Sequence, residues 1–305
     1  MKILSYRELK SKIDLLPLME QAFGWPFIPD EFEDFVREDP RVKNGPVGFC
    51  ALENNKTVAY VGVMDLTTRN AQGKIEKVGG IYGVATLPER TRRGISTALM
   101  NKAHEYFAEK GYNLSLLNTS ETIVAYAMYR KLGYTDASYF PSAYKLVGTD
   151  KPKTRRAKVE LRLNQSRMLK VFDAYTKGKT GFVVRDEADL EALKKNERLN
   201  AKQCMMSQRG YVIFKKEKNL VRIRELVAIN TNEMSKLLDA IEAEARKIVF
   251  ARAILDPRLR EIYRTHGFAV LERGHSVMMA KPLTPGATFK ETYGKQFYIS
   301  SLDHF

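Results

Sequence analysis

The stretch GVATLPERTRRGISTALM, residues 83–100, decides the fold of the first half of the chain. It begins as an apolar run typical of a strand, passes through a basic loop and continues as a helical pattern. The first turn of a helix carries unpaired backbone N–H groups and a partial positive charge, so it suits a pyrophosphate. Gly94 lets the backbone approach a ligand closely. The loop and the helix start add positive charge and hydroxyl groups from Arg92, Arg93, Ser96 and Thr97. The Walker pattern GxxxxGK[ST] is absent, which excludes a P-loop.

Strands and helices surround this stretch on both sides. Strand-like runs cover residues 48–52, 58–66, 78–87 and 112–117, and two short strands flank Pro141. Helical spacing covers residues 95–110 and 123–132, and each of these runs ends at a glycine, Gly111 or Gly133. The first half is therefore predicted to be a mixed α/β domain.

The second half of the chain repeats the end of the first. AMYRKLGY at residues 127–134 is echoed by EIYRTHGF at residues 261–268, so that Tyr129 corresponds to Tyr263. A duplicated domain explains this echo economically, and chance similarity of a common helix ending is the alternative. No glycine or arginine precedes the helix that follows Val227. We therefore expect no pyrophosphate site in the second copy and a structural role for Tyr263.

Length and composition describe a folded protein of about two domains. One core usually stops growing near ~250 residues, and the chain has 305, of which 44% are hydrophobic. No run approaches the ~18 apolar residues of a membrane helix and no signal peptide is evident, so we expect a cytoplasmic protein. Cys50 and Cys204 are single and far apart, which suggests neither a metal site nor a disulfide.

The positive charge belongs to the second half. Residues 1–150 hold 19 basic and 18 acidic side chains, and residues 151–305 hold 32 and 18. The excess is densest from Lys151 to Lys179. Such a run attracts nucleic acid or other polyanions, or it is a solvated helix face and connector, which is the commoner case.

Residues 91–96 resemble the acetyl-CoA-binding motif of the GNAT superfamily of N-acetyltransferases. Gly94 matches the family glycine, whereas Thr91 and Ser96 replace the residues usual at the two ends of the motif. The segment around Tyr129 is similar to a second family signature, with Thr122 in place of the usual Asn. The resemblance implies a strand splayed from its neighbour by a bulge, and acetyl-CoA as the acetyl donor. The implied cofactor-binding residues are Val84, Ala85, Arg92, Arg93, Gly94, Ile95, Ser96 and Thr97. It also implies that Tyr129 is a general acid that protonates the leaving thiolate.

The tandem organisation resembles the enhanced-intracellular-survival type of acetyltransferase, without its sterol-carrier-like domain. This resemblance implies two GNAT-like domains, each a mixed, mostly antiparallel sheet flanked by helices. We expect a GNAT domain with the acetyl-CoA site at residues 1–150, a degenerate GNAT-like domain with a basic connector helix at 151–283, and a tail at 284–305 that folds back toward the active site. In that type the terminal carboxylate acts as the base, and this would be Phe305. A tail that merely covers the core is the alternative.

The acidic run from Asp30 to Asp39 suits a cationic acceptor amine. Glu33 and Asp34 would bind the ammonium group, and Trp25 would stack on the acceptor. Ordinary dipole partners at a helix start, with Trp25 in plain packing, are the alternative.

The sequence as a whole predicts an acetyl-CoA-dependent N-acetyltransferase that acts by direct transfer on a primary amine of a small molecule or a peptide. Two rival interpretations stay open: a Fem-type transferase that uses charged tRNA, and a non-enzymatic nucleic-acid-binding protein. Nucleic acid is the less favoured partner, no membrane partner is expected, and homo-oligomerisation is left open.

Overall fold

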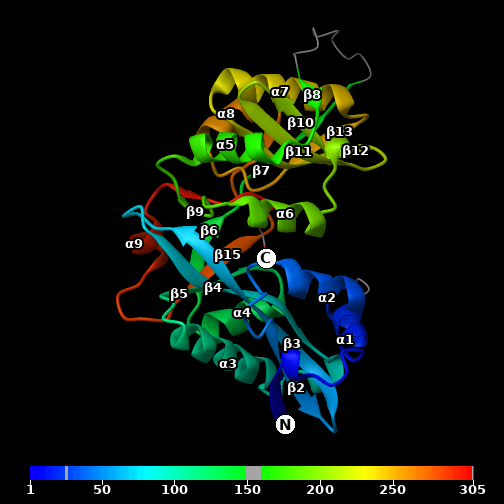
Figure 1. Cartoon of the computed structure of the whole chain (residues 1–305), viewed down its shortest axis with the longest axis vertical. Helices are drawn as coiled ribbons and strands as arrows, with labels where there is room; N and C mark the ends of the chain where they lie inside the picture. Colours follow the sequence, from blue (N-terminus) through cyan, green and yellow to red (C-terminus); the bar gives the residue numbers. More distant parts are fainter. Residues whose placement is uncertain (25–26, 149–158, 304) are drawn as a thin grey trace.

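The computed structural model of the chain describes residues 1–24, 27–148, 159–303 and 305. The helices among them are α1 (Leu15–Phe23), α2 (Pro29–Glu38), α3 (Ile95–Glu109), α4 (Val124–Lys131), α5 (Gln165–Thr176), α6 (Glu187–Asn196), α7 (Thr231–Glu244), α8 (Pro257–Thr265) and α9 (Phe289–Tyr293). The strands are β1 (Lys2–Ser5), β2 (Gly48–Glu53), β3 (Lys56–Arg69), β4 (Ile75–Thr86), β5 (Leu114–Thr119), β6 (Thr135–Tyr139), β7 (Ser142–Leu146), β8 (Glu160–Leu161), β9 (Thr180–Gly181), β10 (Cys204–Ser207), β11 (Gly210–Lys216), β12 (Leu220–Ala228), β13 (Ile248–Ala251), β14 (Ala269–Leu271), β15 (Val277–Pro282) and β16 (Phe297–Tyr298). Figure 1 shows them as two helix-flanked sheets, one above the other.

The first sheet has the strand order β1-β2-β3-β4-β5-β15-β6, and β9, which pairs with β3 and with β16, extends it. Successive residues of β3 point to opposite faces, so Val61 packs under α3 whereas Tyr60 packs under α1. The spacing of Leu99, Met100, Ala103 and Phe107 gives α3 the apolar stripe that it buries on this sheet. The predicted strands and helices of the first half are thereby confirmed, with bounds shifted by a few residues.

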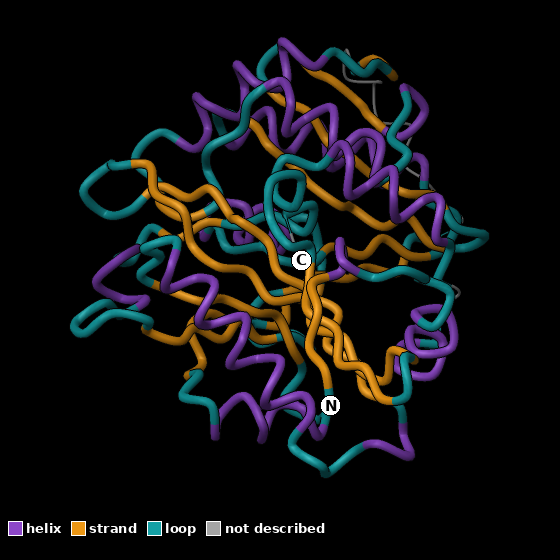
Figure 2. The backbone as a smooth tube through the Cα atoms, turned by 60° about the horizontal axis from the view of Figure 1, so that its bottom comes forward, coloured by secondary structure: helices purple, strands orange, loops and turns teal. Residues whose placement is uncertain are grey.

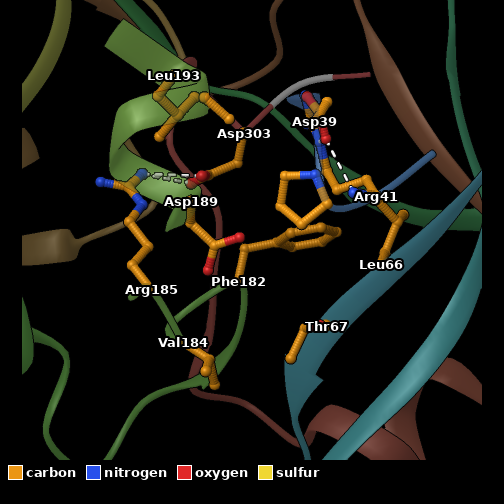
Figure 3. A pocket seen from close by; sticks show the side chains of 12 residues that line it. Asp39, Arg41, Leu66, Thr67, Phe182, Val184, Arg185, Asp189, Leu193 and Asp303 are labelled. Carbon is orange, nitrogen blue, oxygen red and sulfur yellow. Dashed lines mark hydrogen bonds and ion pairs between the residues drawn. The ribbon is translucent and has the colours of Figure 1, made fainter. Parts of the chain in front are cut away.

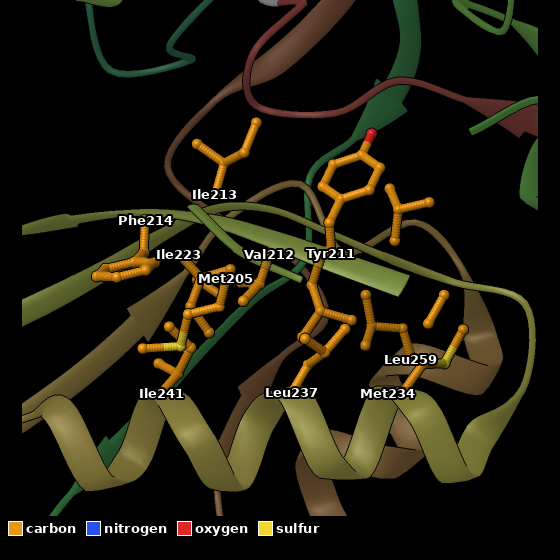
Figure 4. Close-up of a cluster of buried hydrophobic side chains, with 14 of the residues drawn as sticks. Met205, Tyr211, Val212, Ile213, Phe214, Ile223, Met234, Leu237, Ile241 and Leu259 are labelled. Atoms are coloured by element: carbon orange, nitrogen blue, oxygen red, sulfur yellow. The ribbon is translucent and has the colours of Figure 1, made fainter. Parts of the chain in front are cut away.

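The second sheet has the order β14-β7-β13-β12-β11-β10-β8. Helix α7 covers one face through Met234, Leu237 and Ile241, which point into the core against strand residues such as Val212 and Ile223 (Figure 4). Its strands β12 and β13 run parallel, as β4 and β5 do in the first sheet. In each sheet a helix, α3 or α7, connects the two parallel central strands. This shared arrangement agrees with a duplicated domain.

The two sheets exchange a strand. β7 follows β6 in the chain but pairs with β13 and β14 of the second sheet, and β15 returns from the second half to lie between β5 and β6 of the first. The expected division at residues 150 and 283 follows the chain, whereas strand pairing crosses it. Each core is completed by a strand from the other half, so we expect neither half to fold alone.

The observed architecture confirms the predicted fold class of two tandem GNAT-like sheets flanked by helices. The C-terminus lies between the two sheets in both views of the backbone (Figures 1 and 2). Across the described residues, every helix is too short or too polar to cross a bilayer.

Candidate active site

The central strands of the first sheet diverge at one point. β4 and β5 are paired through Gly79, Gly80 and Ile81, and the pairing stops after Ile81 meets Leu117. On its other side β4 shifts register against β3 near Gly83, whose φ of 58° suits a bulge. Val84 lies within this shift and Ala85 just beyond it, on the part of β4 that is separated from β5. Cofactor binding by their backbone stays a prediction. We call this divergence the first splay.

Helix α3 begins a short loop after the end of β4. Its N-cap is Gly94 with φ of 76°, and no side chain caps the helix. A side chain at such a φ would be strained, so glycine is required there. The amides of the first turn therefore stay free of side-chain partners, while Ile95 is buried under the sheet. The Ser96 hydroxyl lies 2.6 Å from the hydroxyl of Thr86 and links the helix to the strand.

A cavity of about 520 Å³ lies in front of this helix start. Its walls are the loop and first turn of α3, the end of β4 and one side of α4, formed by Thr86, Arg90, Thr91, Arg92, Gly94, Ile95, Ser96, Thr97, Val124, Ala127, Met128, Lys131 and Leu132. Arg90 is neutralised by Glu53 at 2.8 Å, whereas Arg92 and Lys131 have no ion-pair partner among the described residues. Arg93 is exposed and does not line the cavity. The site combines free amides with unneutralised cations, which suits a pyrophosphate.

Two polar side chains at the end of β5 lack partners. Asn118 Oδ1 and Thr119 Oγ1 are buried, and no described residue hydrogen-bonds to either atom. Buried polar atoms are rarely left unpaired in folded proteins, so this pair calls for a ligand or water. Asn118 Nδ2 donates to a backbone oxygen of Phe305 at 3.5 Å. Asn118 and Thr119 were missed by the sequence analysis, although two polar residues at the end of an apolar strand are a signal.

Tyr129 lies on α4, beside the separated part of the sheet. It is 6% exposed and its ring meets that of Tyr134 edge-on at 6.1 Å. No described residue hydrogen-bonds to its hydroxyl, and Tyr129 does not itself line the cavity in front of α3. Burial raises the pKa of Tyr129 to about 12, so its hydroxyl is protonated at neutral pH.

The second sheet diverges at the equivalent place, and we call this the second splay. Pairing of β12 with β13 stops after Ile223 meets Ala251. Chain from the C-terminal tail fills this opening: Tyr298, Ser300 and Ser301 lie against it and leave a cavity of about 20 Å³. Tyr263, the counterpart of Tyr129, lines that small space and is 1% exposed.

The helix start next to the second splay is also closed. Asn230 caps α7 by accepting the amide of Glu233, and the Glu233 carboxylate is buried at the first turn. This carboxylate, which pairs with Lys236 at 2.8 Å, occupies the first turn where α3 has no acidic residue, and it would compete with a phosphate there. The structural role predicted for Tyr263 and the missing pyrophosphate site both agree with this arrangement.

Two of the predicted acceptor residues, Glu33 and Asp34, lie on α2. Glu33 forms an ion pair with Lys12 and accepts the Tyr6 hydroxyl at 2.7 Å, so it faces the segment that precedes α1. Asp34 pairs with Arg37 and lines an open groove of about 730 Å³ between α2 and α6. Trp25 lies outside the described residues. The structure therefore separates Glu33 from Asp34 by their contacts.

A smaller cavity of about 60 Å³ lies at the junction of the two halves, where α6 and the tail face β3 (Figure 3). Arg185 and Asp303 on its wall were not singled out from the sequence. In the described part of the predicted basic run, Arg167 donates to Ser207 O and Lys179 pairs with Asp256 at 2.9 Å, whereas Arg162, Lys170 and Lys177 are exposed. Cys50 and Cys204 are buried and free. Within the described residues, no group of three or more histidine, cysteine or acidic side chains could hold a metal ion.

Comparison with known proteins agrees with this geometry. Residues 7–137 match the family model described as acetyltransferase (GNAT) domain. The fold is similar to that of a GCN5-related N-acetyltransferase from Kribbella flavida, with 18% identity, a TM-score of 0.68 and coverage of 92% of this chain and 70% of that one. It is also similar to Eis1 from Mycobacterium abscessus, with 16% identity, a TM-score of 0.61 and coverage of 93% and 74%. None of the curated proteins matches the sequence.

Proposed function

We propose that the chain is an acetyltransferase that transfers an acetyl group from acetyl-CoA directly to a primary amine of a small molecule or peptide, because residues 7–137 match the GNAT acetyltransferase domain. The observation that carries the proposal is the uncapped start of α3, which faces a cavity of about 520 Å³ beside the first splay. Free amides, Arg92 and Lys131 fit a pyrophosphate. The unpaired atoms of Asn118 and Thr119 fit the amides of a pantetheine arm.

We assign cofactor binding to Val84 and Ala85 through their backbone, and to Arg92, Gly94, Ile95, Ser96 and Thr97 at the helix start. Arg93 keeps a weaker role as a nearby positive charge, because its side chain points to solvent. Helix amides bind an anion through the backbone, so the uncharged replacements Thr91 and Ser96 leave the site intact. When bound, acetyl-CoA supplies a thioester whose sulfur leaves as a thiolate.

We assign the general acid to Tyr129. A phenol whose pKa is raised to about 12 holds its proton at neutral pH, which is the form that a general acid needs when the thiolate leaves. Its buried position limits competition from water. The base role of Phe305 stays a prediction that the 3.5 Å contact with Asn118 supports. A carboxylate with a pKa near ~3.5 needs a water chain or a dry setting to act as a base near neutrality.

The acceptor residues are proposed with the least support. Asp34 lines the groove between α2 and α6, whereas Glu33 is engaged by Lys12 and Tyr6. We therefore expect charge reversal at Asp34 to raise the KM of a cationic acceptor more than charge reversal at Glu33. An equal effect of both changes would contradict this order.

The proposal is tested by mixing the protein with acetyl-CoA and one of three amines, namely spermine, kanamycin or a lysine-containing peptide. Release of free CoA thiol and the mass of the acetylated amine are measured. Catalysed acetylation of any of them supports direct transfer. Failure of acetyl-CoA to bind in calorimetry would contradict the proposal, and charged tRNA would become the next donor to test.

A further inference from the structure

One buried arginine joins the second domain to the C-terminal tail. Arg185 follows β9, and its side chain is 4% exposed. Its guanidinium donates to both oxygens of Glu225, at 3.0 and 2.8 Å, and to both oxygens of Asp303, at 2.8 and 2.9 Å. It also donates to Ser300 Oγ at 3.2 Å and lies 4.0 Å over the ring of Phe172. Figure 3 shows Arg185 and Asp303 facing each other across the junction. We call Arg185, Glu225 and Asp303 the clamp.

The clamp has little freedom to move. Glu225 is on β12 with a fully buried side chain, and it also accepts the Tyr211 hydroxyl at 2.7 Å. A charge removed from water is tolerated only while its partners stay in place. Bidentate arginine pairs add a strong directional preference. The clamp therefore fixes Asp303 relative to the second sheet.

Asp303 in turn fixes the last turn of the tail. Its carboxylate accepts the backbone amide of Ser300 at 3.2 Å, and its own amide donates to Ser300 O. Ser301 Oγ donates to Arg224 O beside the second splay. Two residues beyond Asp303, the ring of Phe305 packs on Phe182 at 5.9 Å.

The end of this segment reaches the first splay. The backbone oxygen of Phe305 accepts Asn118 Nδ2, next to the unpaired atoms at the end of β5. The tail therefore runs from the filled splay of the second domain to the open splay of the first. No described residue of the second domain offers a cofactor site of its own at the equivalent place, yet that domain holds the tail on which this contact depends.

We propose that Arg185 is a positioning residue for acetyl transfer, and that with Glu225 it ties Asp303 to the second domain and so sets where Phe305 lies against Asn118. The inference rests on the proposed function. In this proposal the second domain contributes to the reaction because it holds the tail in position. Its prediction is specific, since loosening the clamp lowers turnover and leaves the acetyl-CoA site intact.

Two variants loosen the clamp without leaving a buried charge alone. Asp303→Asn keeps the pair of Arg185 with Glu225. The triple variant Arg185→Met, Glu225→Gln, Asp303→Asn removes all three charges and leaves an acceptor for Tyr211. Glu272→Gln is the matched control, because Glu272 is an exposed acid of the second domain that pairs with Arg260 and Arg264, away from the tail.

Three quantities are measured on the full chain: hydrogen exchange of the 297–305 segment by mass spectrometry, acetyl-CoA affinity by calorimetry, and kcat and KM with spermine, kanamycin or the lysine peptide, whichever is acetylated fastest. We expect exchange of the segment to rise about tenfold and kcat to fall about tenfold or more, since small misplacements are costly in catalysis. Acetyl-CoA affinity and KM should stay within about twofold of wild type, and Glu272→Gln should change nothing.

Each other outcome is decisive. Unchanged kcat in a variant whose tail exchanges faster overturns the positioning role. Reduced kcat with unchanged exchange overturns the clamp. A loss of activity that follows the folded fraction in the melting curve assigns Arg185 a structural role only and also overturns the proposal. Wild-type protein that binds no acetyl-CoA defeats the proposed function itself, which calorimetry separates from the other failures.

Discussion

The two splays have the same framework and opposite contents. In both sheets a parallel central pair separates after three or four paired residues, and a helix begins just after the first strand of that pair. The first splay has a glycine at its helix start, a cavity of about 520 Å³ and unpaired polar atoms on Asn118 and Thr119. The second has an asparagine cap, a buried glutamate and tail residues that leave about 20 Å³. Local chemistry at the helix start and the presence of the tail therefore distinguish the splay that we propose as the cofactor site from the one that is closed.

The largest expected effect comes from giving α3 the chemistry of α7. Thr97 is the third residue of α3, as Glu233 is of α7. Thr97→Glu places a carboxylate among the free amides, and repulsion of a phosphate at about 4 Å costs about 4 kcal/mol at an effective dielectric constant of about 20. Acetyl-CoA affinity should fall about 1000-fold, measured by calorimetry. Thr97→Gln is the neutral control, and an equal loss in both variants would contradict the electrostatic explanation.

The next effect compares the two equivalent tyrosines. Tyr129→Phe should lower kcat about 100-fold, because a positioned acid is worth at least about that factor. Acetyl-CoA affinity should be nearly unchanged. Tyr263→Phe should leave kcat within about twofold, since that ring faces the filled splay. Steady-state kinetics of the two variants check this, and similar losses in both would mean that the equivalence of the tyrosines extends to function.

Acid should destabilise the first domain through His104 on α3. Burial, and then the positive charge of Lys281, lower the pKa of His104 to about 3, against about 6.5 in the unfolded chain. The unfolded state therefore binds a proton that the folded state rejects, and stability is lost as the pH falls from about 6.5 toward 3. The loss should reach about 2 kcal/mol between pH 7 and pH 5. His104→Gln should flatten this dependence in urea unfolding, and an unchanged slope would contradict the assignment.

The smallest effect separates stability from function at the second helix start. Asn230→Ala removes the cap of α7, which should cost about 1 kcal/mol of unfolding free energy. Acetyl-CoA affinity should not change, because α7 lies beside the closed splay. Thermal unfolding and calorimetry check the two parts, and a weakened affinity would indicate a second binding site.

Local features of the fold were predictable from the sequence. Apolar periodicity located α3 and the strands around it, and the echo between Tyr129 and Tyr263 predicted the duplication. The exchange of β7 and β15 was not predictable, because the alternation within each strand is compatible with either sheet. Which partner a strand finds depends on contacts far apart in the chain.

The candidate site was predictable in part for the same reason. Gly94 and its neighbours form one contiguous motif, so the sequence identified the helix start. Asn118 and Arg185 are distant in the chain, and the tail connects them because Phe305 contacts Asn118 and Asp303 pairs with Arg185. Nothing in the sequence around Arg185 indicates that this arginine, one of many in the basic second half, is buried. Glu33 and Asp34 are neighbours in sequence but face different partners on a helix, which a charge count does not reveal.

The central claim is that one splay of the two binds acetyl-CoA. Calorimetric titration of the full chain with acetyl-CoA tests it most directly, with wild type compared with the double variant Arg92→Ala, Arg93→Ala. The account predicts one site per chain and weaker binding in the variant. Two sites per chain would contradict the closed second splay, and binding that is unchanged in both Thr97→Glu and the double variant would contradict the site at the start of α3.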